Sequence, residues 1–142
     1  MNCGDRCISS IRVSISETRK SRPDAGVVAF LSAVGSDELF LSILTLGELR
    51  KGIALKRRTD EPAASELGMW VEGIVTNFAD RILPIDSAIA LRWGELSAGR
   101  SLPVIDMLIA ATALSRGFML VTRNTKDFQS SGVLLLHPWH AR

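Results

Sequence analysis

Three acidic side chains occupy places in this sequence where packing alone has no use for a charge. Glu48 and Asp106 each stand at the start of an apolar segment, and Asp127 lies in a short polar stretch that is typical of a turn. Carboxylates that are scattered in sequence but gathered in space suit a hard cation such as Mg²⁺, which binds few protein oxygens and keeps several waters. Because the sequence carries no other catalytic set, these residues indicate metal-assisted hydrolysis of a phosphodiester.

The elements that must position these carboxylates alternate between strands and helices. We expect strands at residues 39–43, 81–85, 119–122 and 133–136. We expect helices from residue 22, from the Thr45 cap to about residue 58, and at 61–80, 87–96 and 104–116, the last of them closed by Gly117. Such alternation predicts a parallel sheet that is covered by helices on both faces. Binding sites in these sheets lie at the carboxyl ends of the strands. Glu48, Asp106 and Asp127 are therefore predicted to converge at one edge.

Each acid also has a purely structural reading. If Thr45 caps its helix, Glu48 falls at the carboxylate position of a capping box. Asp106 suits the first turn of a helix, where the helix dipole favours negative charge. Its apolar neighbours, however, imply a partly buried carboxylate, which is costly unless a metal or another partner neutralises it. Asp86 is fully explained as the N-cap of the helix at 87–96, so we leave it out of the site.

Motifs along nearly the whole chain, from about residue 15 to residue 140, closely resemble those of one family. They lie at residues 15–20, 22–24, 42–53, 106–113, 122–124 and 137–139. In order and spacing they resemble the PIN-domain ribonucleases, and specifically the VapC-like toxins of type II toxin–antitoxin systems.

The resemblance implies a single domain over residues 1–142 with a three-layer α/β/α fold and a central, mainly parallel sheet. It implies an endoribonuclease that depends on Mg²⁺ or Mn²⁺, with Glu48 and Asp106 as metal ligands. Asn124 matches a further family position where aspartate or asparagine occurs, and Asp127 is a second candidate for orienting the attacking water. A turn residue is the alternative role of Asn124. The implied partners are a cognate antitoxin, an RNA substrate and a second copy of the chain, and the implied location is the cytoplasm. A second copy is also expected because apolar helix residues exceed what one small core needs, among them Leu46, Leu49, Ile53, Leu55, Trp70 and Trp93.

The N-terminal segment departs from the family pattern. Counting back from the Ser16-Glu17 motif places Ile11 where the family has its first catalytic aspartate, and Asp5 lies six residues too early to replace it. Leu-Asp-Thr written CTC GAT ACG and read one nucleotide late becomes Ser-Ile-Arg, the tripeptide at residues 10–12. We therefore hypothesise that residues 1–14 are a frame-shifted leader. Such a chain is predicted to be a poor nuclease or an inactive one.

This leader also raises a packing problem, because a central parallel strand is normally a continuous apolar run. Residues 7–15 alternate instead, and we expect Ile11, Val13 and Ile15 to be recruited into the central strand. Arg12 is then expected either to fray with the leader or to reach Glu48 or Asp106 in place of a metal.

Bulk composition narrows the remaining functions. A chain of 142 residues with 46% hydrophobic and 23% charged residues is one ordinary globular domain, with neither a membrane span nor a secretory signal in its sequence. With a net charge of only +2, the chain as a whole is not basic, so RNA must be bound by local patches. Candidate residues for such a patch are Arg50, Lys51, Arg123 and Lys126. Alternatively, each of them is simply a solvated charge on the surface. His137 and His140 are interpreted as part of a packed tail rather than as a metal-binding pair.

The competing function is a non-catalytic protein that sequesters the antitoxin. A third function, that of a nucleotide-binding domain, is disfavoured because the sequence contains no glycine-rich phosphate loop.

Overall fold

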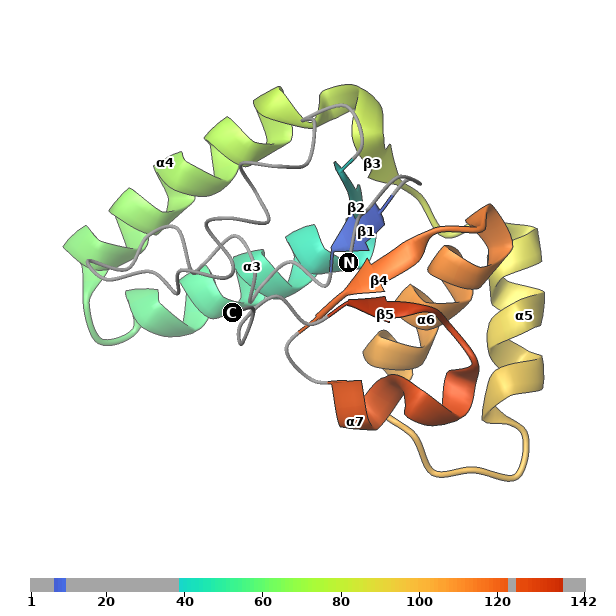
Figure 1. Cartoon of the computed structure of the whole chain (residues 1–142). Helices are drawn as coiled ribbons and strands as arrows, with labels where there is room; N and C mark the ends of the chain where they lie inside the picture. The colour runs from blue at the N-terminus through green and yellow to red at the C-terminus, as the bar shows by residue number, and fades with distance from the viewer. Residues whose placement is uncertain (1–6, 10–38, 123–124, 137–142) are drawn as a thin grey trace, which may run out of the picture.

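The computed structural model describes residues 7–9, 39–122 and 125–136. Its five strands form one sheet in the order β3-β2-β1-β4-β5, and every neighbouring pair is parallel. The strands are β1 (Cys7–Ser9), β2 (Leu39–Ser42), β3 (Ile82–Leu83), β4 (Met119–Val121) and β5 (Leu135–Leu136). Helices lie on either side of these strands (Figure 1). The predicted parallel sheet is therefore confirmed.

The two faces of the sheet carry separate hydrophobic cores. Successive residues of a strand point to opposite faces. Phe40 of β2 packs against one buried cluster and Leu41 belongs to the other, so the clusters lie on opposite faces. Helices α3 (Ile43–Arg57) and α4 (Glu61–Asn77) cover the Leu41 face, whereas α5 (Ser87–Ser97) and α6 (Val104–Arg116) cover the Phe40 face. The result is the expected three-layer α/β/α arrangement.

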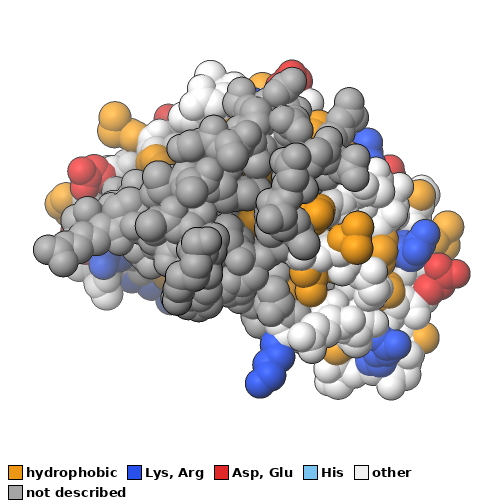
Figure 2. Space-filling view, in the orientation of Figure 1, with side chains coloured by type: hydrophobic (Ala, Val, Ile, Leu, Met, Phe, Trp, Pro, Cys, Tyr) orange, Lys and Arg blue, Asp and Glu red, His pale blue; other side chains and the backbone are white. Residues whose placement is uncertain are grey.

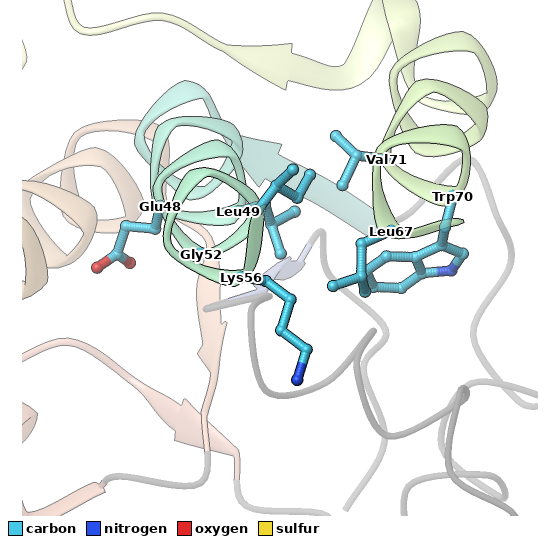
Figure 3. A pocket seen from close by; sticks show the side chains of 8 residues that line it. Glu48, Leu49, Gly52, Lys56, Leu67, Trp70 and Val71 are labelled. Carbon is cyan, nitrogen blue, oxygen red and sulfur yellow. The ribbon is translucent and has the colours of Figure 1, made fainter. Parts of the chain in front are cut away.

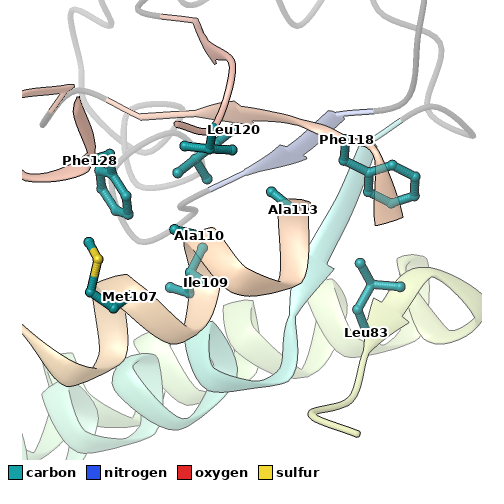
Figure 4. Packing of buried hydrophobic residues seen from close by; sticks show 9 residues of the cluster. Leu83, Met107, Ile109, Ala110, Ala113, Phe118, Leu120 and Phe128 are labelled. Carbon is teal, nitrogen blue, oxygen red and sulfur yellow. The ribbon is translucent and has the colours of Figure 1, made fainter. Parts of the chain in front are cut away.

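The core beneath α6 joins the end of the chain to the sheet. Met107, Ile109, Ala110 and Ala113 of α6 belong to one buried cluster with Leu120 of β4, and Figure 4 shows Met107, Ala110 and Ala113 on the side of α6 that faces Leu120. The short helix α7 (Thr125–Phe128) adds the fully buried Phe128, which faces Met107 in the same view. A 3-10 turn, Gln129–Ser131, then leads toward β5. The residues that directly follow Asp106 and Asp127, Met107 and Phe128, thus belong to one cluster.

Local capping signals explain several helix ends. Asp86 Oδ1 accepts a hydrogen bond from the Ile89 amide at 2.9 Å, which confirms Asp86 as the N-cap of α5. Gly117 adopts a φ of 67°, the left-handed conformation that closes α6 as predicted. Asp60 caps α4, which ends at Asn77 rather than at residue 80; the predicted end is replaced by the 3-10 turn Ala79–Arg81.

The start of α3 corrects the sequence prediction. The helix begins at Ile43, and Ser42 Oγ accepts a hydrogen bond from the Leu44 amide at 3.1 Å. Ser42 is therefore the N-cap, and the prediction that Thr45 caps this helix is wrong. Thr45 lies instead at the third helical position, buried to 1% exposure, and its hydroxyl has no hydrogen-bond partner in the described structure.

The central strand of the sheet is formed near the start of the chain. Cys7–Ser9 pairs with β2 on one side and β4 on the other, so it fills the central position of the sheet. Ile11, Val13 and Ile15, which we expected in this strand, lie outside the described residues, so their recruitment stays a prediction. Arg12 and the predicted helix from residue 22 lie outside them as well.

The apolar residues that suggested a dimer turn out to be used mostly within the chain. Leu49 and Ile53 belong to the core between α3 and α4, and Leu46, Trp70 and Trp93 are partly buried against the two cores. Of that predicted set only Leu55 is exposed, at 51%. Other large apolar side chains are exposed instead, among them Met69, Leu91 and Leu134. No described helix combines the length and the apolar character needed to cross a membrane.

Candidate active site

Glu48 lies in the second turn of α3 and is partly buried. Because the N-cap is Ser42, the third helical position belongs to Thr45 and not to Glu48. A capping-box carboxylate must occupy that third position to reach back to the N-cap amide. The capping explanation of Glu48 is therefore excluded by the observed start of the helix.

Asp106 is the third residue of α6, and it too is partly buried. The N-cap of α6 is Pro103, which provides no side-chain capping bond, and Asp106 is the acidic residue of the first turn. The helix dipole stabilises a carboxylate at this position.

A pocket brings the two helices together. It has a volume of ≈ 360 Å³ and is lined by Ile43, Leu44, Gly47, Glu48 and Lys51 of α3 and by Ile105 of α6. Glu48 thus faces a space that is bounded by the residue directly before Asp106. The predicted convergence of these two segments at the carboxyl edge of the sheet is confirmed, since α3 follows β2 directly and α6 packs beside β4.

The other predicted residues approach this edge to different extents. Thr122, directly after β4, is 1% exposed. Asp127 lies on α7, whose Phe128 packs against Met107, but the Asp127 side chain is not described. Asn124 and Arg123 lie outside the described residues, as do His137 and His140. Asp86 caps α5, as its exclusion from the site anticipated.

The donor chemistry of the pocket fits a hard divalent cation. Glu48 is the carboxylate that lines this pocket, and the partly buried Asp106 directly follows its lining residue Ile105. Mg²⁺ commonly uses only one or two protein carboxylates while keeping several waters. Within the described ranges, no group of three or more His, Cys, Asp or Glu residues could hold a metal ion. A metal site built from the described residues would therefore rest on at most two such side chains.

A second, more apolar pocket of ≈ 220 Å³ lies between α3 and α4. Figure 3 shows Leu67, Trp70 and Val71 of α4 facing Leu49 of α3, while the Glu48 carboxylate points away from them. Glu48 therefore stands between two hollows of different character. The sequence did not indicate that Ile105 and Lys51 line the same pocket, because this depends on how the starts of α3 and α6 meet in space.

A parallel sheet lies between two helical layers, and Glu48 lines a pocket that is bounded by the residue before Asp106, so this is an α/β protein with a carboxylate in its candidate site. Residues 13–132 match the family model described as the PIN domain. The VapC ribonuclease Y4jK of Sinorhizobium fredii is 36% identical over 134 residues, which cover 88% of this chain and 92% of the relative. Toxin FitB of Neisseria gonorrhoeae is 31% identical over 131 residues, covering 89% of this chain and 94% of the relative.

The solved structures agree with the sequence relatives. The crystal structure of FitAcB from Neisseria gonorrhoeae matches this fold with a TM-score of 0.84 at 30% identity, and the match covers 95% of this chain and 99% of that chain. The chain therefore belongs to the PIN domain family, and its relatives include VapC and FitB toxins. The family match begins at residue 13, so Ile11 precedes it.

Proposed function

We propose that this protein is, by descent, a metal-dependent endoribonuclease toxin of a toxin–antitoxin pair that hydrolyses RNA phosphodiester bonds in the cytoplasm. The observation that carries the proposal is the pocket in which Glu48 of α3 meets the start of α6 next to Asp106. The names of two relatives, a VapC ribonuclease and a toxin, support the same activity.

Each proposed residue has a defined task. Glu48 and Asp106 hold the cation, which is Mg²⁺ or Mn²⁺. When bound, such a cation lowers the pKa of its water and stabilises the charge that develops on the phosphate. Asn124 and Asp127 orient the attacking water, since both follow β4 in the sequence and sites in such sheets lie at the carboxyl ends of the strands. Lys51, which lines the pocket with Glu48, provides the positive charge that positions a phosphate.

Ile11 limits this activity in the present chain. An isoleucine at the position of the family's first aspartate removes one carboxylate from the site. Losing an outer partner of a metal site already costs about 10–100-fold in affinity or activity, so losing a direct ligand is expected to cost at least as much. This residue favours a second candidate function, in which an inactive PIN-domain protein keeps the fold and binds the antitoxin without cleaving RNA.

The proposed partners are a cognate antitoxin and a second copy of the chain. The ≈ 220 Å³ hollow between α3 and α4 is lined mainly by apolar side chains, which suits the apolar face of an antitoxin helix. The exposed Met69 and Leu91 provide apolar surface for a homodimer. The solved FitAcB structure supports the antitoxin proposal, because its fold covers nearly all of this chain.

Calorimetric titration with Mn²⁺ tests the assignment of the site. Glu48→Gln and Asp106→Asn each remove a charge at nearly constant shape, so each is expected to weaken Mn²⁺ binding. Asp86→Asn is the matched control, since it changes an acid at the start of α5 and keeps a good N-cap. Binding that is unchanged in both site variants would remove Glu48 and Asp106 from the proposed metal site.

A further inference from the structure

Positive charge is concentrated on one helix of this protein. The whole chain has a formal net charge of only +2, yet residues 48–58 contain five of its 17 Lys and Arg residues and a single acid. The five cations are Arg50, Lys51, Lys56, Arg57 and Arg58. Lys and Arg side chains are visible at the left of Figure 2, where α3 runs into α4 in Figure 1. A nearly neutral chain therefore has a strongly basic segment.

Four of these cations lie in two rows on the exposed face of α3. Arg50 and Arg57 are seven residues apart, as are Lys51 and Arg58, and seven residues are close to two helical turns. Gly47 and Ala54 lie between the rows with the same spacing, and all six residues are exposed. The opposite face carries the buried Thr45, Leu49 and Ile53. We call the exposed set, Gly47, Arg50, Lys51, Ala54, Arg57 and Arg58, the basic face of α3.

The basic face begins at the candidate active site. Gly47 and Lys51 belong to it and also line the ≈ 360 Å³ pocket that contains Glu48. Arg57 pairs with Glu61 of α4 at 3.1 Å, in a bridge whose side chains are 50% and 60% exposed. Across the described structure, no ion pair involves Arg50, Lys51 or Arg58. Three uncompensated cations therefore extend from the pocket along about 10 Å of helix.

We propose that the basic face of α3 binds the phosphates of a single RNA strand and leads that strand to the Glu48 pocket. This proposal rests on the proposed function, which supplies RNA as the substrate. Contacts to phosphates position a nucleic acid without reading its sequence, and cationic side chains are the groups that make them. The small Gly47 and Ala54 leave the space between the two rows open to a backbone.

A strand of RNA fits this surface better than an acidic peptide does. Protein interfaces rely on a buried apolar centre with aromatic or aliphatic anchors. The middle row of the basic face holds only a glycine and an alanine, so a peptide would gain little apolar burial there. Repeated cations without an apolar centre instead match a chain of evenly spaced negative charges.

Fluorescence anisotropy with a short labelled RNA oligonucleotide tests the proposal. The full chain is titrated in the presence of a chelator, so that binding is measured without cleavage, and NaCl is varied. The test variant is Lys51→Gln with Arg58→Gln. The control is Lys56→Gln with Arg92→Gln, which removes the same charge from exposed residues outside the basic face. Melting curves establish that all three proteins are folded.

The test variant should bind RNA roughly 25-fold more weakly than the unmodified chain near 0.1 M salt, because each phosphate contact contributes about 0.7 to the salt slope for a single strand. Its slope should fall by about 1.4, and the control should lose several-fold less affinity. Equal losses in test and control, or no RNA binding by the unmodified chain, would overturn the proposal. The proposal would also be overturned if the test variant lost more affinity for a poly-glutamate peptide than for RNA. Because no step of this assay requires hydrolysis, the proposed nuclease activity succeeds or fails independently of it.

Discussion

Replacing Thr45 by valine tests which residue is the N-cap of α3 and therefore whether Glu48 can be a capping residue. If Thr45 were the N-cap, Thr45→Val would remove the cap and destabilise the protein by about 1 kcal/mol. With Ser42 as the N-cap, the Thr45 hydroxyl is instead a buried group, 1% exposed, without a partner in the described structure. A buried unsatisfied hydroxyl costs about 1–3 kcal/mol. Thr45→Val is therefore expected to stabilise the protein by about 1–2 kcal/mol, since valine and threonine have similar helix propensities.

Thr112→Val provides the matched control. Thr112 is also fully buried in a helix, but its hydroxyl donates a hydrogen bond to the Leu108 carbonyl at 2.8 Å. Losing that bond should destabilise the protein by about 0.5–1.5 kcal/mol, so the two identical substitutions have opposite predicted signs. Urea unfolding measures both, provided that the slope of each transition is unchanged. A Thr45→Val variant that is less stable than the unmodified protein would refute the assignment of Ser42 as the cap.

Three further predictions follow from the described contacts. Ser42→Ala should lower the free energy of unfolding by about 1 kcal/mol because it removes the α3 cap, which urea titration measures; an unchanged midpoint would contradict it. Gly117→Ala should cost about 1 kcal/mol in the same assay, because φ is 67° and no neighbour lies within 4 Å of an added Cβ, so strain of the backbone is the whole effect. The chain should sediment as a homodimer at micromolar concentration without antitoxin, and Leu91→Glu, which places a charge on an exposed apolar side chain of α5, should shift it toward monomer; a monomeric unmodified chain would exclude the dimer.

The sequence predicted those parts of the fold that depend on local signals. Asp86 and Gly117 mark their helix ends correctly, because an N-cap carboxylate and a left-handed glycine act within a few residues of themselves. The parallel sheet followed from the alternation of strands and helices. Sites in parallel sheets lie at the carboxyl ends of the strands. From this we expected the segments of Glu48 and Asp106 to meet, and Glu48 and Ile105 do line one pocket.

Other features depend on packing that no local pattern contains. Ser42 and Thr45 are both good capping residues, and the end of β2 at Ser42 decides which of them caps α3. Leu49 and Ile53 looked like surplus apolar surface, but α4 covers them. The placement of Cys7–Ser9 in the central strand depends on pairing with two strands that are distant in sequence. Lys51 and Ile105 become pocket residues only because the first turns of α3 and the start of α6 meet at this pocket.

Restoring the family motif tests the central claim most directly. The variant Ser10→Leu, Ile11→Asp, Arg12→Thr, Val13→Asn returns the missing carboxylate, and its cleavage of a labelled RNA is measured with Mn²⁺ and with chelator. A second protein carries the same four changes together with Glu48→Gln. The account predicts Mn²⁺-dependent cleavage by the restored protein, little by the unmodified chain, and a loss of at least about 10–100-fold when Glu48→Gln is added. A restored protein that stays inert, or one that cleaves equally well with Glu48→Gln, would contradict it.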